Sequence, residues 1–164
     1  MAPPVIETSA PGSLMLIGEH AVLEGAPAVV AAVDRRLRVR LDSLPGRRIV
    51  IESRLGRVET SWNELSGPEP FRLLLALLKH RRVALEEQGV RLRVESEFTH
   101  KLGLGSSGAV TIACAAALAR RAGETFDRDT LVRQAVDTIR EVQGAGSGAD
   151  AAASAYGGAV CYRR

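Results

Sequence analysis

Aromatic residues are scarce in this sequence, making up only 4% of its 164 residues. The core must therefore be built from Leu, Val, Ile and Ala. Hydrophobic residues still reach 46% of the chain, which argues against disorder. This length is enough for one domain with a core of its own, so we expect a single domain over residues 1–164.

Cysteine is also rare, and Cys114 and Cys161 lack the spacing of a metal site. Cys114 lies in an apolar run, where a small core residue is expected. No apolar run is long enough to span a membrane, and the first residues lack the pattern of a signal peptide. The expected compartment is the reducing cytoplasm, with no membrane partner.

Lysine is nearly absent, with Lys79 and Lys101 as the only two, so arginine carries almost all of the positive charge. The net charge of +3 fits an anionic ligand such as a nucleotide. The sequence has no block of like charge and no basic stretch interleaved with aromatic residues. A nucleic-acid partner is therefore not expected.

Hydrophobic periodicity predicts strands and helices in mixed order. Apolar runs and alternation predict strands over residues 14–17, 28–33, 37–41, 49–51, 90–94 and 159–162. Helical spacing predicts helices over 71–83, from the glycine-rich segment after 102 to about 122, from Asp127 to about 142, and over 150–155. Asp127 is a favourable N-cap residue. The mixed order indicates an α+β fold with one sheet and packed helices.

One glycine-rich segment joins a predicted strand to a predicted helix. Its residues are Gly103, Leu104, Gly105, Ser106, Ser107 and Gly108. Glycine lets the backbone approach a ligand closely. The start of the next helix offers free N–H groups and the positive end of the helix dipole, which together favour phosphate. The two serine hydroxyls add oxygen ligands for phosphate or a magnesium ion.

Three interpretations of this segment stay open. It can be a plain connection whose serines cap the helix. It can be a dinucleotide-binding fingerprint, since it matches G-x-G-x-x-G and Glu124 follows about 20 residues later, although a Rossmann domain usually opens with this motif and here about 100 residues precede it. It can also be the phosphate loop of a kinase, but not a Walker loop, because no G-x-x-x-x-G-K-[ST] is present.

Two other segments carry candidate functional side chains. Glu19 and His20 follow Gly18 at a strand end, where they can form a solvated turn or reach a cleft. Asp150 follows a run of glycines and opens a helix. It can be a first-turn acid favoured by the helix dipole, or a base that takes a proton from a substrate hydroxyl beside a bound phosphate.

Together, the three segments resemble the galactokinase–homoserine kinase–mevalonate kinase–phosphomevalonate kinase (GHMP) superfamily. Residues 11–20 look like its P-G-x-x-x-x-x-G-E-H segment, residues 103–109 are similar to its G-L-G-S-S-x-A signature, and residues 146–150 look like its G-S-G-x-D segment. The resemblance implies an α+β domain like domain 2 of ribosomal protein S5, with one mixed sheet in two layers. It also implies MgATP as phosphoryl donor and a small alcohol or phosphate as acceptor.

The resemblance also implies a role for each segment. Residues 103–108 would hold the ATP phosphates, and Ser107 would help to bind magnesium. Glu19 and His20 would bind the acceptor, and Asp150 would be the catalytic base. The Gly-Glu-His sequence favours mevalonate, a small acid, as the acceptor. The run 101–110 and the Gln-Gly start of the third segment look as much like phosphomevalonate kinase.

Three departures from the family pattern qualify these expectations. Ser13 stands where many mevalonate kinases have a lysine that assists phosphoryl transfer, and Glu141 lies out of register with the family's acidic metal ligand. The sequence ends at Arg164, so we expect the family's C-terminal domain to be absent, with a separate C-terminal kinase domain or self-association in its place. A nucleotide-binding module without turnover and a dinucleotide-binding domain therefore remain alternatives to an ATP-dependent kinase.

Overall fold

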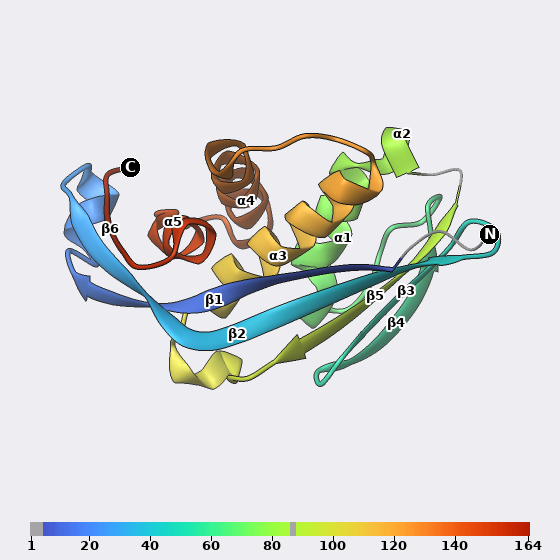
Figure 1. Cartoon of the computed structure of the whole chain (residues 1–164), viewed down its shortest axis with the longest axis horizontal. Coiled ribbons are helices and arrows are strands. Elements are labelled where there is room, and N and C mark those ends of the chain that lie inside the picture. The colour runs from blue at the N-terminus through green and yellow to red at the C-terminus, as the bar shows by residue number, and fades with distance from the viewer. Residues whose placement is uncertain (1–4, 86–87) are drawn as a thin grey trace.

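The computed structural model describes residues 5–85 and 88–164, which form a layer of helices on one mixed β-sheet (Figure 1). The strands are β1 (Ile6–Ile17), β2 (Ala28–Leu44), β3 (Arg48–Ser53), β4 (Gly56–Ser61), β5 (Gly89–Ser96) and β6 (Ala159–Tyr162). The helices are α1 (Arg72–His80), α2 (Arg82–Leu85), α3 (Ser106–Arg121), α4 (Arg128–Gln143) and α5 (Ala149–Tyr156). Three short 3-10 turns are η1 (Ala21–Glu24), η2 (Glu69–Phe71) and η3 (His100–Leu102). The α+β fold with one mixed sheet is thus confirmed.

The long strand β2 organises the sheet. The strand order is β1-β2-β5-β3-β4, and β6 pairs with the first part of β2. All pairings are antiparallel except that of β3 with β5. A dinucleotide-binding fingerprint needs a parallel βαβ unit around its glycines. Here the strand before the glycines lies in a largely antiparallel sheet, so the dinucleotide interpretation lacks its structural context.

The predicted elements differ from the observed ones in four places. The segments predicted over 28–33 and 37–41 are one continuous strand, and β1 begins well before residue 14. The helix predicted over 71–83 is divided, because α1 ends at His80 and α2 begins at Arg82. Strand β4 was not predicted. It contains one large apolar residue, Val58, and it forms by pairing with β3 rather than by burying a face.

The core lies between the sheet and the helices. Leu37, Val39 and Leu41 point into it from β2, while the intervening arginines are exposed on the other face, as the alternation predicts. Alanine-rich α3 packs at the centre of the helical layer (Figure 1). Cys114 is fully buried there, and this burial raises the pKa of its thiol to about 12, so it is a core residue and not a reactive thiol. Within the described residues, no helix is long and apolar enough to cross a membrane.

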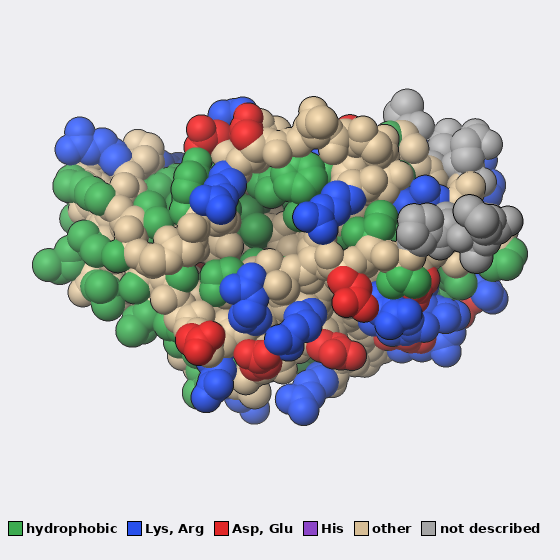
Figure 2. Space-filling model, viewed as in Figure 1, with side chains coloured by type: hydrophobic (Ala, Val, Ile, Leu, Met, Phe, Trp, Pro, Cys, Tyr) green, Lys and Arg blue, Asp and Glu red, His purple; other side chains and the backbone are tan. Residues whose placement is uncertain are grey.

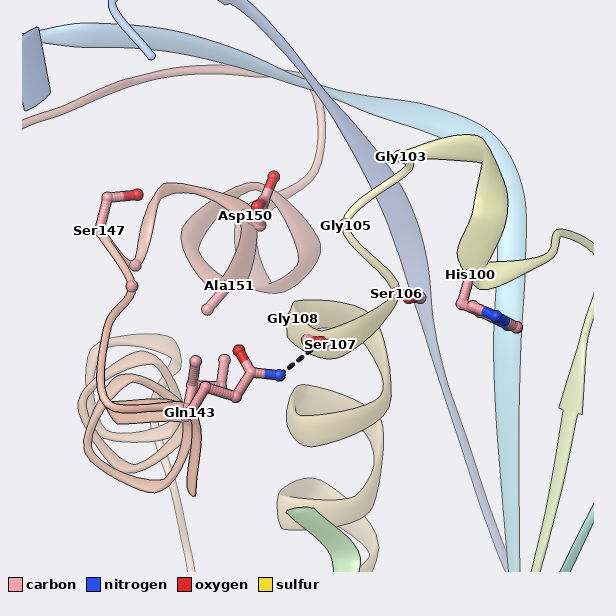
Figure 3. A pocket seen from close by; sticks show the side chains of 13 residues that line it. His100, Gly103, Gly105, Ser106, Ser107, Gly108, Gln143, Ser147, Asp150 and Ala151 are labelled. Carbon is pink, nitrogen blue, oxygen red and sulfur yellow. Dashed lines mark hydrogen bonds between the residues drawn. The ribbon is translucent and has the colours of Figure 1, made fainter. Parts of the chain in front are cut away.

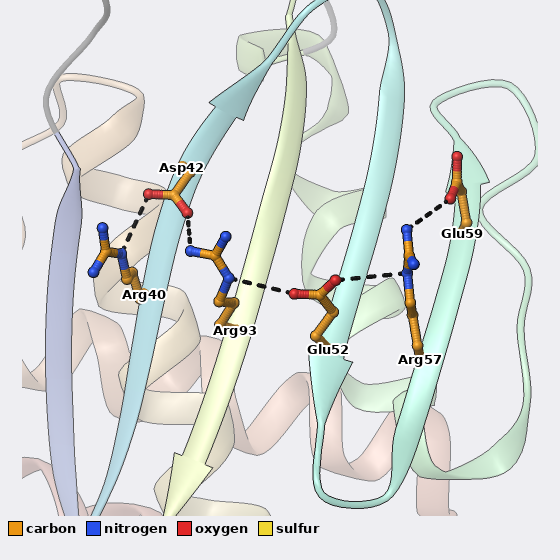
Figure 4. A network of polar contacts seen from close by, with 6 residues as sticks. All are labelled: Arg40, Asp42, Glu52, Arg57, Glu59 and Arg93. Atoms are coloured by element: carbon orange, nitrogen blue, oxygen red, sulfur yellow. Dashed lines mark hydrogen bonds and ion pairs between the residues drawn. The ribbon is translucent and has the colours of Figure 1, made fainter.

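The face of the sheet away from the helices carries a ladder of alternating charges (Figure 4). Arg93 Nη1 lies 2.5 Å from Asp42 Oδ2, and its Nε lies 3.3 Å from Glu52 Oε2. The ladder continues outward to Arg40 from Asp42 at 3.4 Å, and to Arg57 from Glu52 at 3.6 Å. Exposed ion pairs contribute little each. This face is a solvated surface, and the fold depends on the apolar face.

Two neighbours on β5 test this difference between the faces. Leu92 is fully buried, whereas Arg93 lies in the charge ladder. Leu92→Ala is expected to lower the free energy of unfolding by about 2–5 kcal/mol, because it leaves a cavity in the core. Arg93→Ala is expected to lower it by less than about 1 kcal/mol. Urea unfolding of the purified variants measures both, and equal losses would contradict this account of the core.

Candidate functional site

The glycine-rich segment leads into α3 and leaves the first turn of that helix without a side-chain cap. Gly103 and Gly105 have φ of 67° and 60°, the left-handed region that glycine adopts at little cost. Helix α3 begins at Ser106, and no side chain caps it. Ser106 and Ser107 therefore do not cap the helix, contrary to that detail of the plain-connection interpretation. The first N–H groups of α3 and the positive end of its dipole remain open to an anion.

A second helix start faces the same space. Helix α5 follows Gly148, whose φ is 97°, and its first N–H, on Ala149, donates to Ser147 Oγ at 3.2 Å. The carbonyl of Ser147 accepts from Tyr162 Oη at 3.0 Å and from Arg140 Nη2 at 3.4 Å. These two hydrogen bonds hold the backbone at Ser147, just before the start of α5.

The two helix starts enclose a pocket of about 310 Å³ (Figure 3). Its lining comes from the glycine-rich segment, the end of α4 and the start of α5: His100, Gly103, Gly105, Ser106, Ser107, Gly108, Ile139, Gln143, Gly146, Ser147, Gly148, Asp150 and Ala151. The second and third sequence motifs, 45 residues apart at Gly105 and Asp150, thus share one cavity. A cavity lined by helix starts and hydroxyls suits a phosphate group.

Ser13 brings the first motif to this pocket. Its hydroxyl donates to Asp150 Oδ1 at 2.7 Å, and its backbone N–H donates to the carbonyl of Leu104 at 3.0 Å. Ser13 is fully buried. A Cβ at Gly105 would lie only 2.0 Å from Ser13 Oγ, so this close approach requires glycine. The three motifs therefore meet around Asp150.

Ser107 lies in the pocket, as expected for a metal ligand. Its hydroxyl accepts a hydrogen bond from Gln143 Nε2 at 3.1 Å (Figure 3). No group of three or more His, Cys, Asp or Glu side chains that could hold a metal occurs among the described residues. Magnesium is commonly held by one or two protein oxygens together with substrate phosphates. The pocket fits that mode, in which Ser107 Oγ would be the protein ligand in place of its hydrogen bond from Gln143.

The remaining predicted residues lie elsewhere. Glu19 and His20 are exposed in the turn between β1 and η1, and neither belongs to the lining of the phosphate pocket. The structure therefore does not bring them to Asp150. Glu141 is likewise outside the lining, because its carboxylate pairs with His80 Nε2 of α1 at 2.7 Å.

A larger cavity of about 540 Å³ adjoins the phosphate pocket and was missed from the sequence. The two cavities share His100, Ser106, Ser107 and Gln143. The rest of its lining is mostly apolar: Leu37, Leu55, Pro70, Phe71, Leu73, Leu74, Val94, Phe98, Val110 and Val142. The polar lining residues are Ser53, Arg54, Glu69, Arg72, Ser96, Thr99 and Lys101. The one available signal was that two of the three phenylalanines of this aromatic-poor chain line it.

The model of the GHMP kinases N-terminal domain matches residues 71–158, more than half of the chain. The chain belongs to this family. It is 32% identical over 170 residues to the mevalonate kinase of Pyrococcus furiosus, covering 95% of this chain and 51% of that protein. It is 36% identical over 180 residues to the phosphomevalonate kinase of a Streptomyces species, covering 94% of this chain and 48% of that protein.

The solved structure of the Methanococcus jannaschii mevalonate kinase supports the GHMP fold. It superposes with a TM-score of 0.83 at 24% identity, covering 98% of this chain and 53% of that chain. The chain spans about half the length of the curated relatives that it matches.

Two glycines of the glycine-rich segment, Gly103 and Gly105, test how tightly the site is packed. Both have positive φ, but a Cβ at Gly105 would collide with Ser13 and approach Asp150, whereas a Cβ at Gly103 would meet nothing within 4 Å. Gly103→Ala is expected to lower the free energy of unfolding by about 1–2 kcal/mol, the cost of the left-handed backbone alone. Gly105→Ala is expected to lower it by a further ~1–3 kcal/mol from overpacking. Urea denaturation compares them, and equal losses would mean that Ser13 can move away freely.

Proposed function

We propose that this chain is the nucleotide-binding half of an ATP-dependent kinase that phosphorylates mevalonate. The observation that carries the proposal is the pair of helix starts, of α3 and α5, that face one pocket with Asp150 in its lining. Two positive dipole ends on one cavity favour a polyphosphate over a neutral ligand. In this proposal the segment of residues 103–108 holds the ATP phosphates.

The adjoining apolar cavity supports a nucleotide rather than a free phosphate. It includes Ser106 and Ser107, where the phosphates would lie, and Phe71 and Phe98 also line it. A flat aromatic base fits an apolar lining. The pocket at the two helix starts therefore suits the phosphates of ATP, and the adjoining apolar cavity suits its base.

The chain's own residues supply positioning and proton transfer. Backbone N–H groups at the start of α3 bind phosphate oxygens and are already oriented before the ligand arrives. Asp150, held by Ser13, takes the proton from the acceptor hydroxyl as that oxygen bonds to the γ-phosphorus of ATP. The bond between this phosphorus and the β–γ bridging oxygen breaks, and ADP leaves. Ser107 Oγ would hold magnesium together with phosphate oxygens, and the ion would neutralise phosphate charge there.

Mevalonate is the proposed acceptor because several relatives with more than 30% identity are mevalonate kinases and the chain carries Gly18-Glu19-His20. Phosphomevalonate is the alternative, because the Streptomyces relative is a phosphomevalonate kinase at 36% identity. Binding of the acceptor by Glu19 and His20 stays a prediction. Both are exposed at the end of β1, where a second domain could complete the site.

Exposed apolar side chains support a partner for this chain. Leu14, Leu16, Ile17 and Leu23 are 46–67% exposed. Hydrophobic side chains gather at that end of the molecule in Figure 2, where β1, η1 and β6 lie in Figure 1. Because the relatives are about twice as long, we propose that a C-terminal kinase domain covers this surface, with self-association as the alternative.

Two finer assignments belong to the same proposal. The two-layer arrangement of one mixed sheet under packed helices supports a fold like domain 2 of ribosomal protein S5. The cytoplasm remains the expected compartment.

The role of Ser107 is testable in the isolated chain. Ser107→Ala is expected to weaken MgATP binding by about tenfold, because one oxygen ligand is lost, while the unfolding transition stays unchanged. Titration calorimetry measures the affinity. The control is the same titration with ATP in EDTA, where the substitution should have little effect. Unchanged MgATP affinity, or an equal loss in EDTA, would remove Ser107 from the metal site.

The role of Asp150 requires turnover. In an assembly that phosphorylates mevalonate, Asp150→Asn is expected to lower kcat by roughly 10²–10⁴-fold, the range for a positioned general base. The affinity for ATP should change much less, because the carboxylate serves the acceptor. Mevalonate-dependent release of ADP measures the rate. Near-normal turnover of the variant would reduce Asp150 to a first-turn acid of α5.

A further inference from the structure

We propose that Ser13 is a positioning residue for Asp150. Its hydroxyl holds one carboxylate oxygen so that the other is presented to the acceptor. The proposal rests on the proposed role of Asp150 as the base. Its basis is the 2.7 Å hydrogen bond from Ser13 Oγ to Asp150 Oδ1, made by a serine that is fully buried.

Ser13 itself is fixed at three points. Its backbone pairs with Ala32 in the sheet, its N–H donates to the carbonyl of Leu104 at 3.0 Å, and its hydroxyl donates to Asp150. The register between β1 and β2 shifts between Pro11 and Ser13, at Gly12. This irregularity re-aims the strand locally, as bulges do beside functional sites. Ser13 therefore offers Asp150 a donor whose position is set by the sheet and the phosphate loop together.

A second hydrogen bond joins α5 to β1, and it serves as a control. It holds the helix on the strand without contacting the Asp150 carboxylate. Ser154 lies one helical turn after Asp150, on the same face of α5. Its hydroxyl donates to the carbonyl of Pro11 at 2.9 Å, and the contact is buried. Both hydrogen bonds hold the helix on the strand, but only that of Ser13 reaches the carboxylate in the pocket lining.

A serine does this without bringing a charge. Among the described residues, Ser13 is the one side chain that donates to Asp150, and Oδ2 has no hydrogen-bond partner. A neutral hydroxyl fixes Oδ1 while avoiding the cost of burying an ammonium group at a fully buried position. Oδ2 is left to accept the proton of the acceptor hydroxyl. The base is thus oriented by a hydrogen bond from a neutral donor.

The kinetic test compares Ser13→Ala with the matched control Ser154→Ala in the assembly that turns over the acceptor. Each removes one hydrogen bond between α5 and β1. Ser13→Ala is expected to lower kcat by about 10- to 100-fold, the equivalent of one hydrogen bond to a charged group, with KM for ATP within about twofold. Ser154→Ala is expected to leave kcat within about twofold. Equal kcat losses in the two variants would reduce Ser13 to a docking residue and overturn the proposal.

A double substitution separates this proposal from the proposed function. If Ser13 acts through Asp150, Ser13→Ala should have no further effect on kcat in the Asp150→Asn background. Losses that multiply would overturn the positioning role. If Asp150→Asn alone keeps its turnover, the proposed function fails and the positioning role fails with it. If only Ser13→Ala is silent, the proposed function stands and the positioning role alone fails.

A structural test needs no turnover and uses the 164-residue chain itself. A crystal structure of the Ser13→Ala variant is expected to show the Asp150 carboxylate rotated or in more than one rotamer, with α5 still docked through Ser154. An Asp150 side chain in the same single rotamer as in the parent chain would overturn the proposal.

Discussion

The hydrogen bond from Ser13 to Asp150 joins residues that are 137 positions apart in the sequence. It is the point at which β1, the glycine-rich segment of residues 103–108 and α5 meet, because the Ser13 N–H also donates to the carbonyl of Leu104. The rest of the site depends on this junction. Without it, α3 and α5 would still begin at the same pocket, but no side-chain hydrogen bond from the described residues would hold the Asp150 carboxylate there. A preoriented carboxylate is what a base in a phosphate pocket requires.

Close backbone approach is the second constraint, and it divides the glycines into two kinds. A Cβ at Gly12 would lie 2.8 Å from the carbonyl oxygen of Leu104, and one at Gly108 would lie 2.9 Å from the backbone nitrogen of Ala151. These glycines let the strand and the two helices approach each other. Gly103 meets nothing within 4 Å and is needed only for its positive φ. Some glycines of these motifs are therefore required by close packing of the backbone, whether or not a ligand binds there.

The sequence predicted what local periodicity and capping determine. Alternation along β2 placed its arginines outward, and Asp127 is the N-cap of α4, where the Thr130 N–H donates to its carboxylate and holds the pKa of Asp127 below its usual value. Strand β4 was missed because pairing with β3, and not its own pattern, makes it a strand. The meeting of Ser13 with Asp150 and the cavity between Phe71 and Phe98 were also missed, because contacts between distant segments leave no local signal.

We propose above all that the starts of α3 and α5 form a phosphate site beside Asp150, whose carboxylate Ser13 holds in place. A crystal structure of the chain with magnesium and a non-hydrolysable ATP analogue tests it most directly. We expect the phosphates to lie against the N–H groups of Ser106 and Ser107. The base should lie in the apolar cavity lined by Phe71 and Phe98. Asp150 should still accept its hydrogen bond from Ser13. Phosphates bound away from the start of α3, or a base outside the apolar cavity, would contradict it.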